Sequence, residues 1–359
     1  MLDLSAGGPG LDDGNVLVLV TGGTGFLGSH SVAEILRAGH RVRLLVRDPA
    51  TVAPALGPLG VAPGAVEPVR GDVTDPGAVA RAVRGCDAVL HAASVYSFDS
   101  RDRAAMRAVN VRGTELVLDA AVAAGADPIV YVSSFAALLP ADSAPLHTES
   151  PVGAPREAYM ATKARAEEAA RRAQRAAAPV VITYPLATLG PDDPKLGDQA
   201  TRVRNALRGL MPMWPSGGFP VGDVRDVARL HAAVLTPGRG PRRFLAQGRY
   251  VSTREFVRVL RRVTGRTLPA LHLPAAAMLP VGALTDLVQR LVPAHIPAEY
   301  GAIYTCLVGR AVDTAATDRL LGPAHTTFET TLRDTVRWLH RAGHIPDRLA
   351  GTAAVLEAT

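Results

Sequence analysis

Short apolar runs alternate with longer helical segments through the first half of the chain. The runs have the length and the branched residues of buried strands, and they lie at residues 15–20, 42–46, 66–70, 88–91, 129–133 and 180–184. Segments with a helical spacing of apolar positions join them, and the longest cover about 103–124 and 157–177. This alternation predicts an α/β fold built on a Rossmann-type, doubly wound parallel sheet. In such sheets ligands bind beyond the carboxyl ends of the strands.

The pattern becomes less regular after Pro185. Residues 186–220 are rich in proline and glycine, and a strand running into a helix is expected over 221–235. Ser252 and Glu255 have the spacing of a capping box before a further helix. The sequence therefore predicts a flexible tail, a dinucleotide-binding Rossmann domain and a smaller, mostly C-terminal substrate-binding lobe. Their boundaries are 1–14, 15–185 and 186–359, and about 221–262 is expected to return to the Rossmann domain.

The composition is that of a folded protein with a sizeable core, since 48% of the 359 residues are hydrophobic and 20% are charged. The net charge is +6, but the 37 arginines are spread along the chain, which favours solvated helix faces and no nucleic-acid partner. Two cysteines are too few for a disulfide scaffold and suit a cytoplasmic protein. Ten histidines without metal-ligand spacing predict no metal site.

The longest uncharged stretch, residues 267–285, contains three prolines and is a poor candidate for a membrane-spanning helix. The first fourteen residues lack the basic and apolar regions of a secretory signal, so a cytoplasmic location is expected. The apolar residues of 268–292 leave three interpretations open. They line a pocket for a hydrophobic substrate, they form the core of the lobe, or they rest on a membrane surface.

A glycine-rich turn follows the first predicted strand. Gly22, Gly25 and Gly28 are spaced at three-residue intervals before a helix. Glycines there allow a tight turn and let the backbone approach a pyrophosphate at the helix N-terminus. The alternative is an ordinary glycine-rich turn with no ligand.

The end of the second strand predicts which dinucleotide binds. Enzymes that use NAD carry an acidic residue there for the ribose hydroxyls, whereas this chain has Val46 followed by Arg47. A guanidinium binds a phosphate through two hydrogen bonds, so Arg47 favours NADP(H), with NAD(H) as the alternative cofactor. Asp72, after the third strand, is expected near the adenine. A plain surface arginine is the competing interpretation of Arg47.

Three residues with the chemistry of proton transfer follow the fifth strand. Ser134 ends that strand, Tyr159 lies twenty-five residues later, and Lys163 is four residues further on. Residues four apart share one helix face, so the phenol and the ammonium are expected in one cleft. A chain with two lysines and seven tyrosines seldom has this spacing by chance.

Together these features resemble the extended branch of the short-chain dehydrogenase/reductase family, also called the NAD-dependent epimerase/dehydratase superfamily. The resemblance covers about 16–235, and it is closest to dihydroflavonol reductase and 3β-hydroxysteroid dehydrogenase-like members. It rests on Thr21-Gly22-x-x-Gly25-x-x-Gly28, Asp72, His91-Ala92-Ala93, Asn110-x-x-Gly-Thr114, Ser134 and Tyr159-x-x-x-Lys163.

The resemblance implies a role for four residues. Tyr159 is expected to act as general acid in reduction and as base in oxidation, with its pKa lowered by Lys163. Lys163 is also expected to hold the nicotinamide ribose, and Ser134 to hydrogen-bond the substrate oxygen. Asn110 matches a residue that supports a water-linked proton relay, and a packing role is its alternative.

The resemblance also implies binding residues. The expected cofactor-binding residues are Thr21, Gly22, Thr24, Gly25, Phe26, Leu27, Gly28, Arg47, Asp72, Val73, His91, Ala92, Ala93, Lys163, Tyr184 and Pro185. The candidate substrate contacts are Ser94, Tyr96, Phe135, Leu186, Met213 and Trp214.

The predicted activity is an NADP-dependent oxidoreductase that moves hydride between nicotinamide and a carbonyl or alcohol of an apolar small molecule. Many nucleotide-sugar epimerases and dehydratases of this branch have Arg-Pro after the sixth strand, where this chain has Tyr184-Pro185. That activity is therefore the alternative, followed by a non-catalytic NADP-binding sensor. Family members often dimerise, so a homodimer is a further expectation.

Overall fold

The computed structural model describes residues 15–142, 144–291 and 300–354, so the expected tail at 1–14 lies outside the described residues. Its centre is a seven-stranded sheet in which every paired strand is parallel to its neighbour. In order across the sheet, the strands are β10 (Arg242–Leu245), β6 (Val180–Tyr184), β5 (Ile129–Val132), β4 (Ala88–His91), β1 (Leu17–Thr21), β2 (Arg41–Val46) and β3 (Val66–Arg70). This confirms the predicted Rossmann-type fold.

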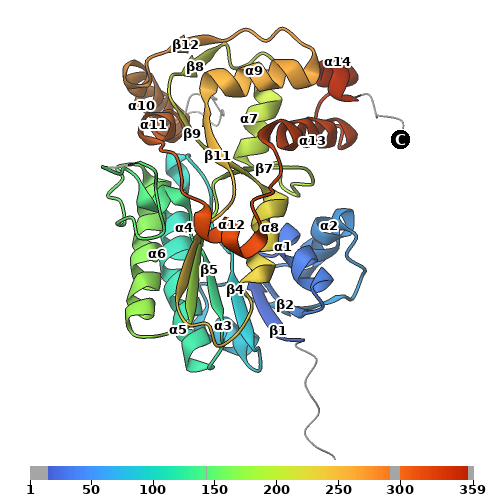
Figure 1. Ribbon diagram of the computed structural model, residues 1–359, viewed down its shortest axis with the longest axis vertical. Helices are drawn as coiled ribbons and strands as arrows, with labels where there is room; N and C mark the ends of the chain where they lie inside the picture. The colour runs from blue at the N-terminus through green and yellow to red at the C-terminus, as the bar shows by residue number, and fades with distance from the viewer. Residues whose placement is uncertain (1–14, 143, 292–299, 355–359) are drawn as a thin grey trace, which may run out of the picture.

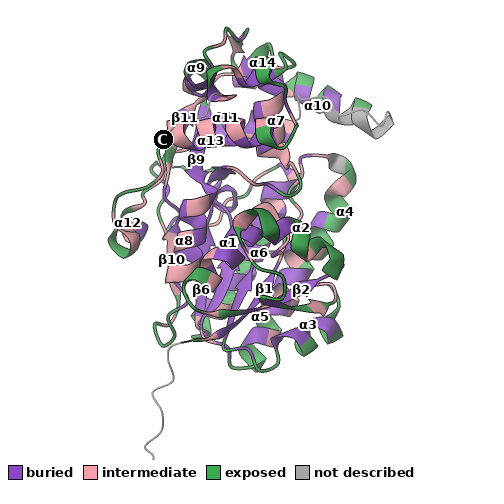
Figure 2. Cartoon of the chain, turned by 90° about the vertical axis from the view of Figure 1, so that its right-hand side faces the viewer, coloured by how far each residue is buried: buried purple, intermediate pink, exposed green. Residues whose placement is uncertain are grey.

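Helices cover both faces of this sheet, which is why its central strands are buried along their whole length (Figure 2). One face is covered by α1 (Phe26–Arg37) and α8 (Val224–Ala233), which pack against each other. The other face carries α3 (Pro76–Val83), α5 (Thr114–Ala123) and α6 (Ala158–Arg175) (Figure 1). The strand order reverses between β1 and β4, so a crevice opens beyond their carboxyl ends.

The helix expected at 103–124 is interrupted. The structure has α4 (Arg103–Met106), a π-helical segment (Arg107–Gly113) and then α5. Wide π-helical turns are rare and occur mostly near functional sites. Here the wide turn contains Asn110, whose buried side chain bonds to the loop after β4.

The remaining elements form a smaller part above the carboxyl ends of the large sheet (Figure 1). It contains a three-stranded sheet of β11 (Arg249–Ser252), β9 (Gly218–Asp223) and β7 (Ala187–Leu189), and a two-stranded sheet of β12 (Leu271–Leu273) and β8 (Met213–Pro215). Its helices are α7 (Asp198–Leu207), α9 (Thr253–Thr264), α10 (Ala275–Leu291), α11 (Tyr300–Val308), α13 (Phe328–Arg341) and α14 (Asp347–Ala350).

The chain passes between the two parts more than once. After β9, α8 packs on α1 and β10 pairs with β6, whereas β11 and α9 lie in the smaller part. Helix α9 begins as a half-formed capping box. The Ser252 hydroxyl accepts from the Glu255 amide at 3.1 Å, but the Glu255 carboxylate pairs with Arg249 at 2.7 Å. The arginine side chain competes successfully because it offers the carboxylate a charged partner.

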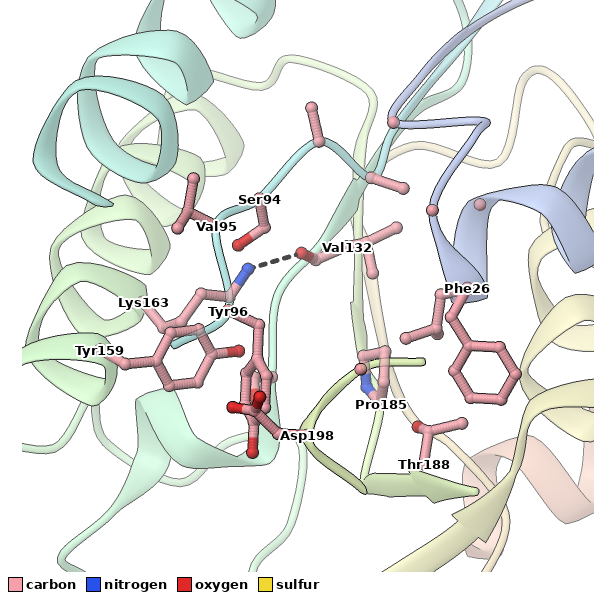
Figure 3. A pocket seen from close by; sticks show the side chains of 18 of the residues that line it. Phe26, Ser94, Val95, Tyr96, Val132, Tyr159, Lys163, Pro185, Thr188 and Asp198 are labelled. Carbon is pink, nitrogen blue, oxygen red and sulfur yellow. Dashed lines mark hydrogen bonds between the residues drawn. The ribbon is translucent and has the colours of Figure 1, made fainter. Parts of the chain in front are cut away.

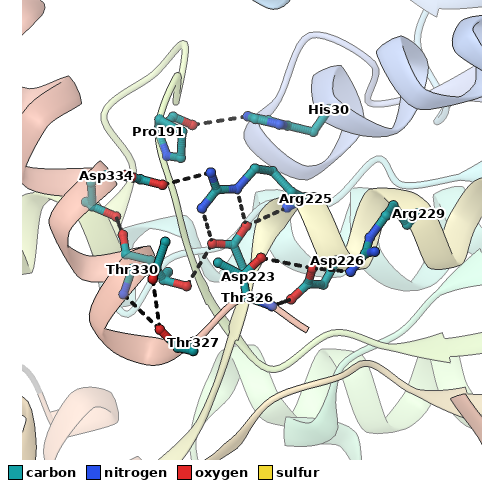
Figure 4. A network of polar contacts seen from close by, with 12 residues as sticks. His30, Pro191, Asp223, Arg225, Asp226, Arg229, Thr326, Thr327, Thr330 and Asp334 are labelled. Atoms are coloured by element: carbon teal, nitrogen blue, oxygen red, sulfur yellow. Dashed lines mark hydrogen bonds and ion pairs between the residues drawn. The ribbon is translucent and has the colours of Figure 1, made fainter. Parts of the chain in front are cut away.

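A polar network fastens α13 to the start of α8 (Figure 4). The buried Asp223 carboxylate accepts from the Arg225 guanidinium at 2.7 Å and from the Thr331 hydroxyl at 2.7 Å. Arg225 also pairs with Asp334 at 2.8 Å. The network therefore fixes the smaller part over the large sheet.

No helix in the described ranges is long and apolar enough to cross a membrane.

Candidate active site

A cavity of about 560 Å³ lies at the carboxyl ends of the central strands, between the two parts of the molecule (Figure 3). It brings together most of the residues expected from the sequence. Those that line it are Gly22, Thr24, Gly25, Phe26, Leu27, Gly28, Arg47, Asp72, Val73, Ala92, Ala93, Ser94, Tyr96, Ser134, Phe135, Tyr159, Lys163, Pro185 and Leu186.

The glycine turn has no room for side chains. Gly22 has a φ of +74°, and a Cβ there would lie 2.6 Å from the Ala93 nitrogen. A Cβ on Gly28 would lie 2.1 Å from the Gly22 oxygen. Glycine at both positions therefore lets α1 begin directly against the ends of β1 and β4.

The N-terminus of α1 opens into the cavity. Gly25 precedes its first residue, no side chain caps it, and its first turn carries no acidic residue. The free backbone N–H groups and the helix dipole favour an anion at this point. The arrangement fits the pyrophosphate of a dinucleotide. A Cβ at Gly28 would disturb it, because that atom would overlap the Gly22 oxygen.

Charged groups at the end of β2 and β3 border the same cavity. Arg47 is exposed, and it makes no hydrogen bond or ion pair with any residue that the structure describes. The neighbouring Asp48 carboxylate is engaged locally, where it accepts from the Ala50 amide at 3.0 Å. Asp72 accepts from the amide and the hydroxyl of Thr74 at 2.9 and 2.7 Å. Arg47 is thus the cationic group that is available to a ligand at this edge.

The other end of the cavity carries the phenol and the ammonium. Glu157 caps α6 by accepting from the amides of Tyr159 and Met160 at 2.9 and 2.8 Å, which fixes the first turn that bears Tyr159. The Lys163 ammonium donates to the Val132 carbonyl oxygen at 2.9 Å. In Figure 3 the Tyr159 hydroxyl points into the cavity beside Tyr96 and Asp198.

Burial dominates the protonation of these two groups. It raises the pKa of Tyr159 above its ordinary value, and a hydrogen bond with Ser134 opposes this rise. It lowers the pKa of Lys163 to about 8, against a smaller raising effect of Glu167. The expected lowering of the Tyr159 pKa by Lys163 is therefore not found, because the ammonium turns toward Val132. Tyr159 is protonated at neutral pH and is poised to donate.

Asn110 does not line the cavity, and its side chain is fully engaged. Its Oδ1 accepts from the Val95 amide at 2.7 Å and from the Ser94 hydroxyl at 3.1 Å. Its Nδ2 donates to the Val95 oxygen at 2.9 Å and to the Thr162 hydroxyl at 3.1 Å. Of its two interpretations, the structure favours packing against backbone, which ties the loop after β4 to α6.

Thr21 and His91 also lie behind the cavity wall and not on it. The Thr21 hydroxyl bonds to His91 Nδ1 at 2.7 Å, and His91 Nε2 bonds to the Thr114 hydroxyl at 3.0 Å. Burial lowers the pKa of His91 to about 3, so the ring is neutral. Thr21 accepts in turn from the Ala93 amide at 3.2 Å. These side chains therefore position the loop after β4 instead of touching a ligand.

Three expected contacts lie elsewhere. The Tyr184 hydroxyl donates to Glu167 at 2.6 Å, and Tyr184 does not line the cavity. Met213 is exposed, and Trp214 packs on Phe256, because β8 pairs with β12 at the outer side of the smaller part. Neither side chain reaches the cavity.

The apolar run at 268–292 does not line the cavity as far as its residues are described. Val281 and Leu284 are exposed on α10, Met278 is buried against α11, and Leu287, Leu291 and Val292 lie outside the described side chains. Other residues also line the cavity, and the sequence pattern did not predict them. These are Val95, Phe98, Met160, Ala187, Thr188, Asp193, Lys195, Asp198, Gln199, Arg202, Phe219 and Thr305. Many come from the irregular segment before and within α7, where no periodic pattern signalled them.

No cluster of His, Cys, Asp and Glu side chains in the described part of the chain could hold a metal ion.

Known proteins share this order of strands and motifs. A family model for the NAD dependent epimerase/dehydratase family matches residues 18–246. The chain belongs to this family. Its members of the extended short-chain dehydrogenase/reductase type are NAD(P)-dependent, and this chain is an NAD(P)-dependent oxidoreductase of that type.

Individual relatives in this family include reductases. The chain is 30% identical to sterol demethylase protein B of Methylococcus capsulatus, over 91% of this chain and 99% of the relative. It is 32% identical to a 4-hydroxy-2-methyl-3-oxo-4-farnesyl-3,4-dihydroquinoline-1-oxide ketoreductase of Stigmatella aurantiaca, over 82% and 86% of the two chains. Among solved structures, the dTDP-glucose 4,6-dehydratase DesIV of Streptomyces venezuelae superposes with a TM-score of 0.71 at 25% identity, over 93% and 99%.

Proposed function

We propose that this chain uses NADP(H) to interconvert a carbonyl and an alcohol on an apolar small molecule. The observation that carries the choice of cofactor is the exposed Arg47 guanidinium at the end of β2, beside the cavity and without a partner among the described residues. Asp48, the nearby acidic residue, is occupied by the Ala50 amide and is poorly placed to hold ribose hydroxyls. A 2′-phosphate suits the guanidinium fork.

The chain's own groups divide the work of the reaction. The first turn of α1 would bind the pyrophosphate, Arg47 the 2′-phosphate, and Lys163 the ribose on the nicotinamide side. The bound nicotinamide cofactor supplies or accepts the hydride. In reduction, the protonated Tyr159 hydroxyl gives its proton to the substrate oxygen, and Ser134 hydrogen-bonds the same oxygen. In oxidation the proton moves in the opposite direction.

Aromatic rings around Tyr159 support an apolar substrate. The Tyr96 and Phe98 rings meet the Tyr159 ring edge to face, with centroids 4.7 and 6.2 Å apart. Phe135 and Leu186 also line the cavity. A carbonyl next to Tyr159 would therefore belong to a molecule whose body contacts rings and aliphatic groups. Two of the relatives, the ketoreductase and the sterol demethylase protein, have names consistent with such molecules.

A second candidate is a nucleotide-sugar epimerase or dehydratase. The observation in its favour is the pair of cations, Lys195 and Arg202, that line the substrate end of the cavity and could bind a diphosphate. An epimerase would keep its cofactor bound and show no net consumption of NADPH. Incubation with UDP- and dTDP-sugars, followed by product analysis, separates this activity from carbonyl reduction.

The decisive experiment is to measure the dissociation constants of NADPH and NADH for the wild-type protein and for Arg47→Ala. We expect a preference for NADPH that collapses in the variant. Arg41→Ala is the matched control, because Arg41 is also an exposed arginine of β2 but does not line the cavity. Equal affinities in the wild type, or an unchanged preference in Arg47→Ala, would overturn the NADP assignment.

Tyr159→Phe separates an enzyme from a sensor. An enzyme should lose turnover of apolar ketones and aldehydes yet still bind NADPH, since only the phenolic proton is removed. A variant that keeps wild-type turnover would show that Tyr159 is not the proton donor.

A further inference from the structure

A stripe of buried polar side chains runs along the inner face of α6, behind the cavity. Tyr159, Lys163, Glu167 and Arg171 follow one another at intervals of four residues, and all are at most 9% exposed. Residues at this spacing are neighbours on one face of a helix. The stripe therefore leads from the candidate proton donor to a carboxylate two turns deeper in the protein.

Glu167 is fully buried, and only one of its oxygens is satisfied. Its Oε1 accepts from the Tyr184 hydroxyl at 2.6 Å and from the Arg171 Nε at 2.7 Å. Its Oε2 makes no hydrogen bond to any described residue. A carboxylate oxygen left bare in the interior costs free energy, so a structural role alone explains Glu167 poorly.

Lys163 has few groups nearby to stabilise its charge. Its ammonium donates to the neutral Val132 oxygen and lies 5.2 Å from the centroid of the Tyr131 ring. On β4, His91 is neutral, and its pKa is lowered in part by the positive charge of Lys163. Tyr159, on the same helix, is protonated. Glu167, one turn further along α6, is the anion that acts on Lys163.

We propose that Glu167 is a positioning residue that acts through Lys163, its buried carboxylate holding the Lys163 side chain in the ammonium form that faces the cavity. Arg171 and Tyr184 in turn hold the Glu167 carboxylate in place by hydrogen bonds. Burial alone would drive Lys163 toward the neutral amine. The inference rests on the proposed function and deepens it, because a charged Lys163 is the form expected to bind the ribose hydroxyls of the cofactor.

The chain is suited to a direct test because Lys163 and Lys195 are its only lysines. In a Lys195→Arg background, protein labelled with ¹³C-lysine gives a single lysine Cε signal, whose pH titration reports Lys163. We expect a midpoint near the value of about 8 indicated by its burial. Glu167→Gln should lower it by about two pH units, the effect of removing one of two unit charges about 6 Å apart at an effective dielectric constant of about 20.

Tyr184→Phe is the matched control, because it removes a hydrogen bond from Glu167 but leaves both charges. Its Lys163 midpoint should stay within about 0.3 pH units of the background, far less than the shift of about two units expected for Glu167→Gln. Glu167→Asp, which keeps the charge, should also stay close to the background. If Glu167→Gln leaves the midpoint unchanged, or if Tyr184→Phe lowers it equally, the proposal is wrong.

Glu167→Gln leaves Arg171 buried without its anion and could prevent folding. The double variant Glu167→Gln/Arg171→Gln removes both charges together, which proteins tolerate better. It should still lower the Lys163 midpoint, because Glu167 is the nearer charge, and an unchanged midpoint overturns the proposal. The NMR titration needs neither cofactor nor substrate, so its outcome is independent of whether NADPH binds. NADPH affinity measured from pH 5 to 10 then shows whether the pH at which binding weakens is lower in Glu167→Gln than in the wild type.

Discussion

The tight packing of Gly28 against Gly22 leads to a quantitative prediction for Gly28→Ala. The added Cβ would lie 2.1 Å from the Gly22 oxygen, whereas an ordinary contact begins at 3.4 Å, so one of the two backbones must move by about 1.3 Å. Neither backbone segment can move by itself, since Gly22 directly follows β1 and Gly28 lies in the first turn of α1. Overpacking of this kind costs about 1–3 kcal/mol of unfolding free energy.

The same movement displaces the N–H groups that would face the pyrophosphate. Losing one charge-assisted hydrogen bond weakens binding by about 1.5–3 kcal/mol, which corresponds to a dissociation constant for NADPH roughly ten- to a hundredfold higher. Urea unfolding measures the first effect, and titration of NADPH fluorescence measures the second.

Gly57→Ala is the matched control for this prediction. Gly57 has a φ of −56°, and no atom lies within 4 Å of the position that a Cβ would take there. Alanine should therefore fit and stabilise the protein by about 0.4–1 kcal/mol, with unchanged NADPH affinity. A Gly28→Ala protein that binds NADPH within twofold of the wild type would refute the assignment of the α1 N-terminus as the pyrophosphate site.

Three further predictions concern stability and the substrate. Burial lowers the pKa of His231 to about 3, so between pH 6.5 and 3 the unfolded state binds a proton that the folded state does not, and stability decreases as the pH is lowered. Urea unfolding should show a loss of about 2 kcal/mol from this group between pH 7 and pH 5. His231→Gln should remove that part of the loss, whereas the same change at exposed His325 should not, and identical pH dependence in both variants would contradict the reasoning. Arg225→Met leaves the buried Asp223 without its cation and should cost about 3 kcal/mol of unfolding free energy. Arg37→Met removes an exposed ion pair and should cost under about 1 kcal/mol. Equal losses in the two variants would show that the network does not stabilise the contact between the two parts. Tyr96→Ala should raise KM for apolar ketones up to about tenfold through the lost ring contact, Tyr96→Phe should not, and an unaffected KM in both would place the substrate elsewhere.

Local chemistry made part of the site predictable. Gly22 and Gly28 are required by the turn itself, and the spacing of Tyr159 and Lys163 needs only a helix to put both on one face. Both features depend only on residues that are close in the sequence, so they could be predicted without the fold. The predicted strands likewise reflect burial on both faces of a parallel sheet, which leaves an apolar run that is visible without the fold.

Long-range contacts decided the features that the sequence pattern left hidden or misleading. Asn110 and Tyr184 were expected at the site, but their side chains bond to Val95 and Glu167, which only packing brings near them. Met213 and Trp214 could have lined a substrate pocket or packed the lobe, and the pairing of β8 with β12 keeps both out of the cavity.

The sequence by itself determined the sheet, the glycine turn at the start of α1 and the residues of the candidate proton donor, because each is encoded by periodicity or by short spacing. The tertiary structure decided which charges and rings share the cavity. Arg202 and Phe219 meet there from α7 and β9, and Tyr96 reaches Tyr159 across 63 residues of chain. It also decided the protonation of Tyr159 and Lys163, since burial sets their pKa values and only the folded chain buries them.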